Sequence, residues 1–93
     1  MKIYHINSKE AIKDFFADIQ SRYKQPFDPI DDLSLLTAEN GQPVFAEEEE
    51  AYMDDVMLTC FVYCADHRLD IHDIAEEVHQ ELYRFSPWLA ATA

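Results

Sequence analysis

The architecture of this chain depends first on residues 46–65, which read AEEEEAYMDDVMLTCFVYCA. Four glutamates open the stretch, where negative charge suits the N-terminal end of a helix dipole. Apolar residues then recur at helical spacing, namely Tyr52, Met53, Val56, Met57, Cys60, Phe61 and Cys64. Leu58 and Val62 widen this apolar side, so we expect the second half of the helix to be the buried centre of the domain. A buried strand over residues 56–63 is the competing prediction, because a short apolar run has no decisive period.

Two shorter helices are predicted on either side of this one. Residues 8–24 carry one apolar stripe, and Asn7 stands three residues before Glu10, the spacing of a capping box. Residues 70–85 carry another stripe behind Asp70, a suitable N-cap residue. The first stripe contains Ile12, Phe15, Phe16, Ile19 and Tyr23, and the second contains Ile71, Ile74, Ala75, Val78, Leu82 and Phe85.

The remaining segments predict minor β structure. Residues 2–6 are β-branched and aromatic, which favours a short strand. Residues 26–45 are irregular, and Asn40-Gly41 inside them favours a small hairpin or an ordered loop. Residues 86–93 form a tail. We therefore expect a mainly helical α+β fold: a single compact domain of three helices, a short N-terminal strand and a small hairpin.

The composition excludes several function classes. The 93 residues are 48% hydrophobic and include one glycine, which is typical of a folded domain. Nineteen acids against seven bases give a net charge of −12, so direct binding to nucleic acid or to an anionic membrane is not expected. Because no apolar segment at the start resembles a signal peptide, a cytoplasmic location is expected.

The excess negative charge is concentrated after Phe27. Residues 28–81 contain sixteen acids and one base, Arg68, whereas residues 1–27 carry a net charge of +2. Six carboxylates occupy eight helical steps of residues 46–65, roughly 12 Å of axis, and four more lie on the last helix. One strand of duplex DNA carries a phosphate about every 3.4 Å. The predicted partner-binding residues are therefore Glu47, Glu48, Glu49, Glu50, Asp54, Asp55, Asp73, Glu76, Glu77 and Glu81.

Metal and catalytic chemistry is not expected. Cys60 and Cys64, with His67 after them, are zinc-ligand types without the spacing of a zinc site, and buried reduced thiols are the favoured interpretation. His72 and His79 lie near Asp73 and Glu76 on the last helix, and surface histidines are favoured there over metal ligands. No catalytic residue, metal or cofactor is predicted.

One stretch resembles a known enzyme family. Asp54-Asp55-Val56-Met57-Leu58, followed by residues 65–71, is similar in cadence to the second half of the MazG-type nucleotide pyrophosphatases. That resemblance implies an all-α fold that holds magnesium with an E-x-x-E pair on one helix and an E-x-x-D pair on the next. Here Glu47-x-x-Glu50 precedes Asp54 and Asp55 on one helix, and the first helix offers only Asp14 and Asp18. A small magnesium-dependent nucleotide hydrolase is thus the third hypothesis.

The leading hypothesis is a non-enzymatic acidic inhibitor that occupies a basic, nucleic-acid-binding surface of another protein or complex. It resembles a class of small acidic proteins from phages and mobile elements, which includes nucleic-acid mimics, anti-restriction proteins and anti-CRISPR proteins. The second hypothesis is an adaptor or homodimer that uses an apolar C-terminal patch of Tyr83, Phe85, Trp88 and Leu89. A solvated acidic face that serves solubility alone remains an alternative to both.

Overall fold

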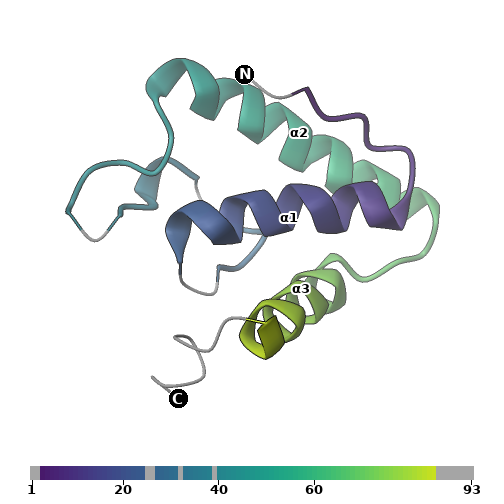
Figure 1. The fold of residues 1–93 in the computed structure, drawn as a ribbon. Helices are drawn as coiled ribbons and strands as arrows, with labels where there is room; N and C mark the ends of the chain where they lie inside the picture. The colour runs from purple at the N-terminus through teal and green to yellow at the C-terminus, as the bar shows by residue number, and fades with distance from the viewer. Residues whose placement is uncertain (1–2, 25–26, 32, 39, 86–93) are drawn as a thin grey trace.

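The chain folds into three helices. A computed structural model describes residues 3–24, 27–31, 33–38 and 40–85, in the order α1 (Lys9–Tyr23), a 3₁₀ turn η1 (Leu33–Leu35), α2 (Glu47–Asp66) and α3 (Ile71–Phe85). Figure 1 shows α1 between α2 and α3. The described residues contain no strand, so the predicted α+β class is wrong and the domain is helical.

The predicted strand over residues 2–6 is absent from its described part, residues 3–6. A strand needs a neighbouring strand to take up its backbone donors and acceptors. Here the Tyr4 backbone N–H donates instead to the Tyr52 hydroxyl at 2.8 Å, and the Tyr4 hydroxyl donates to the Asp18 carboxylate at 2.7 Å. Side-chain contacts therefore hold this segment across α1 and α2.

The predicted hairpin is also wrong. Gly41 turns the chain with φ +81°, as the Asn40-Gly41 pair indicates, but among the described residues the two sides of the turn pair only at an isolated bridge between Thr37 and Pro43. Two backbone hydrogen bonds flank the bridge, from the Ala38 N–H to the Gln42 carbonyl at 2.7 Å and from the Val44 N–H to the Leu36 carbonyl at 3.0 Å, and these pair too few residues to make strands. The chain then leads through Phe45, whose side chain is buried, into the first turn of α2.

The helix boundaries are close to those predicted, and one cap differs. Ser8, not Asn7, is the N-cap of α1, and its hydroxyl accepts a hydrogen bond from the Ala11 N–H at 3.1 Å. The helix ends where Lys24 adopts φ +60° and donates its N–H to the Gln20 carbonyl. The Asp70 carboxylate accepts from the His72 N–H at 2.9 Å, as expected of an N-cap.

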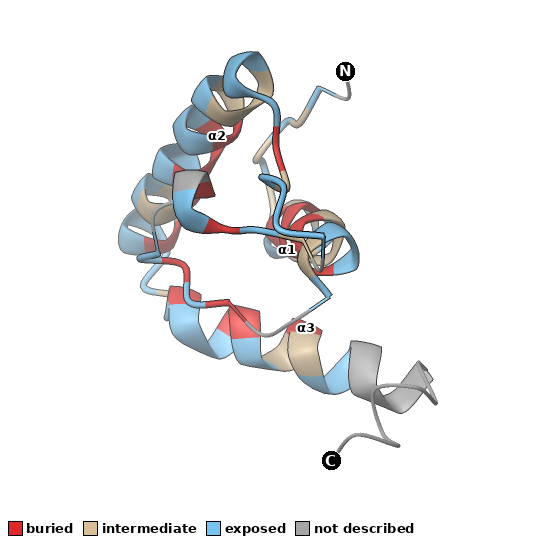
Figure 2. Cartoon of the chain, turned by 90° about the vertical axis from the view of Figure 1, so that its left-hand side faces the viewer, coloured by how far each residue is buried: buried red, intermediate tan, exposed pale blue. Residues whose placement is uncertain are grey.

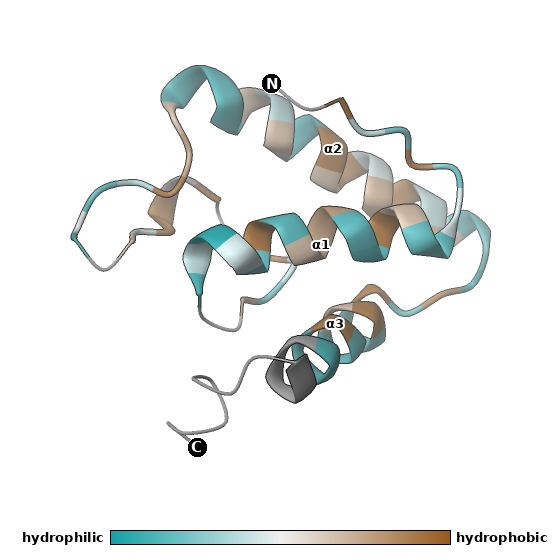
Figure 3. Ribbon diagram, in the orientation of Figure 1, coloured by the Kyte–Doolittle hydropathy of each residue, from teal (hydrophilic) through white to brown (hydrophobic). Residues whose placement is uncertain are grey.

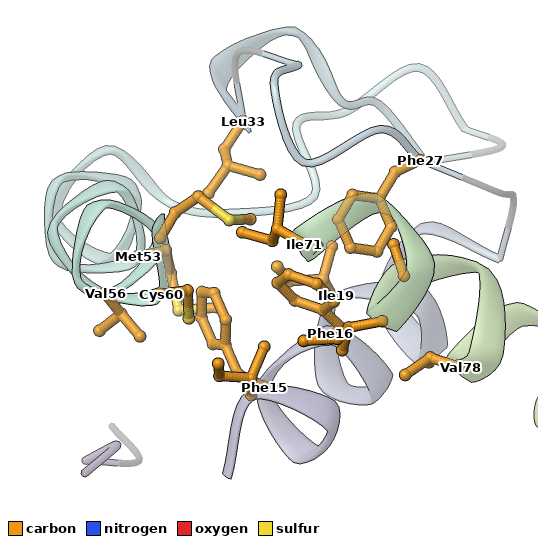
Figure 4. Close-up of a cluster of buried hydrophobic side chains, with 14 of the residues drawn as sticks. Phe15, Phe16, Ile19, Phe27, Leu33, Met53, Val56, Cys60, Ile71 and Val78 are labelled. Atoms are coloured by element: carbon orange, nitrogen blue, oxygen red, sulfur yellow. The ribbon is translucent and has the colours of Figure 1, made fainter. Parts of the chain in front are cut away.

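The core lies where the three helices face one another (Figure 4). From α1 it contains Ile12, Phe15, Phe16 and Ile19; from α2 Met53, Val56, Met57, Cys60 and Cys64; and from α3 Ile71, Ile74, Ala75 and Val78. These positions confirm the described part of the predicted stripes. Both thiols are buried, also as predicted, and burial raises the pKa of Cys60 to about 12.

The second half of α2 is not buried all round, contrary to prediction. Residues 56–63 are helical, which decides against the buried strand. Leu58, however, is 64% exposed and Val62 is 53% exposed. The reason is geometric: α2 turns one side to the core, and the described chain puts no element against the opposite side (Figure 2). No helix in the described ranges is both long and apolar enough to cross a membrane.

Candidate protein-binding surface

The exposed side of α2 carries both acids and apolar residues. Positions 47, 51, 55, 58, 62 and 66 recur at steps of three or four, so they share one side of the helix. We define the outer face of α2 as Glu47, Glu48, Ala51, Asp55, Leu58, Val62 and Asp66, all of them exposed. The first turn is hydrophilic, and the colour changes toward apolar in the middle of the helix (Figure 3).

The acids of the outer face are not paired with a base in the part of the chain that the structure describes. Glu47, Glu48, Asp55 and Asp66 make no ion pair with any residue that the structure describes. Asp54 is exposed beside them, and Glu50 is half-buried. Like charges held together on one helix repel one another, so the four acids of the outer face do not stabilise the fold through pairing with described residues.

Glu49, by contrast, is part of the packing between α1 and α2. Its carboxylate accepts a hydrogen bond from the Arg22 guanidinium at 2.6 Å, and this hydrogen bond raises the pKa of Arg22. The same guanidinium lies over the Phe45 ring, 5.2 Å from its centroid, which is cation–π geometry. Of the four consecutive glutamates, this one has a structural role.

The acids of α3 are divided in the same way. Lys9 of α1 lies 3.0 Å from Glu77, and Lys13 lies 2.7 Å from Glu81 and 4.0 Å from Glu77. The hydrogen bond from Lys9 lowers the pKa of Glu77, and the hydrogen bond to Glu81 raises the pKa of Lys13. These ion pairs join α1 to α3.

Asp73 and Glu76 are the remaining predicted site residues of α3. Both are exposed, and neither forms an ion pair within the described ranges. In Figure 2 the exposed side of α2 faces left and that of α3 faces down. The ten predicted acids therefore do not form one surface: six are on α2, four are on α3, and three of the ten are paired to α1.

Sequence reasoning missed the basic partners because it compared charges only within each helix. A usable signal was present. Lys9 and Lys13 are four residues apart on α1, and Glu77 and Glu81 are four residues apart on α3, so two packed helices bring the pairs together.

The candidate metal ligands are not brought together. Among the described residues, no three His, Cys, Asp or Glu side chains are grouped so that they could hold a metal ion. The His67 ring stacks on Tyr63 with centroids 3.9 Å apart. His79 Nε2 accepts a hydrogen bond from the Phe27 N–H at 3.3 Å, and burial lowers the pKa of His79.

The structure describes the residues of the candidate magnesium site but not those of the apolar C-terminal patch. Of the carboxylates considered for magnesium, Asp18 accepts a hydrogen bond from the Tyr4 hydroxyl, and Glu47 is exposed on the outer face. The apolar C-terminal patch cannot be placed, because Trp88, Leu89 and the side chains of Tyr83 and Phe85 lie outside what the structure describes.

Comparison with known proteins adds no relative. No protein-family model, no curated protein and no solved structure matches the chain.

Proposed function

We propose that this protein is a non-enzymatic acidic inhibitor that acts inside the cell. It uses the outer face of α2 to occupy a basic, nucleic-acid-binding surface of another protein. The observation that carries the proposal is the separation of the acids. Glu49, Glu77 and Glu81 have basic partners on α1, whereas Glu47, Glu48, Asp55 and Asp66 have none in the described chain.

The outer face resembles nucleic acid in the negative sign of its electrostatic field, but its charges are not spaced like phosphates. Glu47 and Asp66 are nineteen residues apart, roughly 28 Å along the helix. Four carboxylates over that length are sparser than the phosphates of one DNA strand, which are about 3.4 Å apart. The net charge of −12 adds a long-range field that accelerates encounter with a basic partner and weakens as salt is added.

The test is capture of the partner with two matched variants. Immobilised protein is exposed to a bacterial lysate at low salt, and the captured proteins are identified by mass spectrometry. The test variant is Glu48→Gln with Asp55→Asn, and the control is Glu10→Gln with Asp14→Asn. Each pair removes one exposed acid from the first turn of a helix and one exposed acid further along, so the change in net charge is equal.

The proposal expects a captured protein that binds nucleic acid, elutes with salt and is displaced by duplex DNA or RNA. The Glu48 and Asp55 variant should lose it, and the Glu10 and Asp14 variant should keep it. A partner that both variants hold equally, or that stays bound in high salt, contradicts the proposal.

A further inference from the structure

Two apolar side chains stand in the middle of the outer face of α2. Leu58 and Val62 are one helical turn apart, so their Cβ atoms are about 6 Å apart, and both are more than half exposed. Ala65 is exposed on the next turn, and Phe61 beside it is half-buried. Together these four side chains form a continuous apolar strip, unlike the isolated apolar residues that are common on protein surfaces.

The strip continues into an open cleft where α2 meets α3. The cleft has a volume of about 490 Å³ and shares Phe61 and Ala65 with the strip. Leu69 and Ile71 add apolar surface to its wall, beside the polar side chains of Arg68, Asp70 and His72. The exposed apolar surface therefore extends past the C-terminal end of α2.

Acids border the strip at both ends. Asp55 lies one turn before Leu58, and Asp66 lies one turn after Val62. Arg68 is the only base in residues 28–81, and it lies just beyond the end of the helix. A surface that covers the strip thus meets negative charge on either side of it.

This charge pattern is unfavourable for a second copy of the chain. If two α2 helices packed antiparallel with Leu58 opposite Val62, Asp66 of each copy would come opposite the Asp54–Asp55 pair of the other. In a parallel arrangement, Asp55 would face Asp55. Either arrangement brings two acidic faces together, which like-charge repulsion opposes.

We propose that the segment of the partner that covers the outer face is a basic amphipathic helix. Its apolar stripe covers Leu58 and Val62, and its Lys or Arg residues pair with Asp55 and Asp66. Those two acids are eleven residues apart, roughly 16 Å along the axis, so the bases of the partner helix lie about three turns apart. This inference rests on the proposed function and adds an apolar contact to it.

The test uses two synthetic helical peptides of equal length and charge. Both have lysines three turns apart; one carries leucines between them on the same side, and the other carries glutamines there. Binding is measured by fluorescence anisotropy at low and physiological salt, with wild type, Leu58→Gln with Val62→Gln, and Ile30→Gln. Ile30 is 69% exposed and lies outside α2, which makes it a matched control for losing an exposed aliphatic side chain.

We expect wild type to bind the leucine peptide about tenfold more tightly than the glutamine peptide. The Leu58 and Val62 variant should lose this preference, and the Ile30 variant should keep it. Circular dichroism checks that each variant is folded.

The remaining outcomes separate this inference from the proposed function. Equal affinity for the two peptides overturns the inference, and so does a wild-type dimer that Leu58→Gln with Val62→Gln dissociates. The proposed function fails separately if Glu48→Gln with Asp55→Asn leaves the affinity for both peptides unchanged at low salt.

Discussion

The outer face of α2 and the contact between α1 and α3 use the same kind of residue in opposite ways. In the contact, Lys9 and Lys13 pair with Glu77 and Glu81 and hold two helices together. On the outer face, the acids have no ion-pair partner within the described residues. A count of acids is therefore not a measure of the charge available to a partner, because some of it is already neutralised within the chain.

Arg22→Met should cause the largest loss of stability, because the Arg22 side chain makes two different contacts at once. The change removes the ion pair to Glu49 and the cation–π contact to Phe45, together worth about 1–2 kcal/mol of unfolding free energy. Urea denaturation measures it, with Lys24→Met as control, since Lys24 is exposed and has no ion pair in the described chain. Equal midpoints for the two variants would show that the Glu49 pair is not structural.

Lys13→Met should have a smaller effect of the same sign. It leaves Glu77 and Glu81 as neighbouring acids on one helix, with Lys9 as the one base that the described ion pairs still place beside them. Glu48→Gln with Asp55→Asn should leave stability unchanged or raise it, because the repulsion that is removed is at least as large as the attraction of Glu48 to the N-terminal end of the helix dipole. Thermal melts of the three proteins side by side decide the matter, and a drop in the Glu48 and Asp55 variant would mean that these acids support the fold.

Acid pH should reduce the stability that the ion pairs between α1 and α3 contribute, and with it the contrast to the unpaired acids of the outer face. The hydrogen bond from Lys9 keeps the pKa of Glu77 in the folded protein below its ordinary value of 4.5. Its contribution to stability is therefore present above pH 4.5 and is lost as the pH falls through the folded pKa. The stability difference between wild type and Lys9→Gln, taken from urea curves, should shrink over that range, and a constant difference down to pH 3 would contradict the pairing.

Moderate salt should have the smallest effect. Screening relieves repulsion on the outer face while it weakens the pairs between α1 and α3, so the two regions respond with opposite signs. We expect a slight rise in wild-type melting temperature, a smaller rise or a fall for Glu48→Gln with Asp55→Asn, and a larger rise for Lys13→Met. The same response in all three proteins would show that the two regions do not differ in this way.

The helices were predictable from the sequence because their information is local. The stripe of α1 and the cap at Asp70 each depend on residues a few positions apart, and the structure agrees with both to within a residue. The predicted strand at residues 2–6 failed because a strand depends on a distant partner, and the backbone of Tyr4 found the Tyr52 hydroxyl instead. The residues of a short β segment do not indicate which distant group its backbone will bind.

The acids of the candidate site were predictable from the sequence, but their ion pairs were not, because these too depend on residues far apart in the chain. The acids of α2 are visible in the sequence, but ion pairs such as Arg22 with Glu49 join residues 27 positions apart. The pair of Lys13 with Glu81 spans 68 positions. The exposure of Leu58 and Val62 was hidden because α2 is apolar on nearly every side after Asp55, so periodicity alone does not say which side meets the core.

The most direct test of the proposed role compares two charge-matched variants in one binding experiment. Glu48→Gln with Asp55→Asn removes two acids of the outer face, and Glu77→Gln with Glu81→Gln removes two acids paired to α1. The association rate with the basic leucine peptide is measured by stopped flow at low salt. We predict that the first variant associates severalfold more slowly than wild type, whereas the second stays close to wild type and is less stable. Equal slowing in both variants would contradict the account, since only the total charge would then matter.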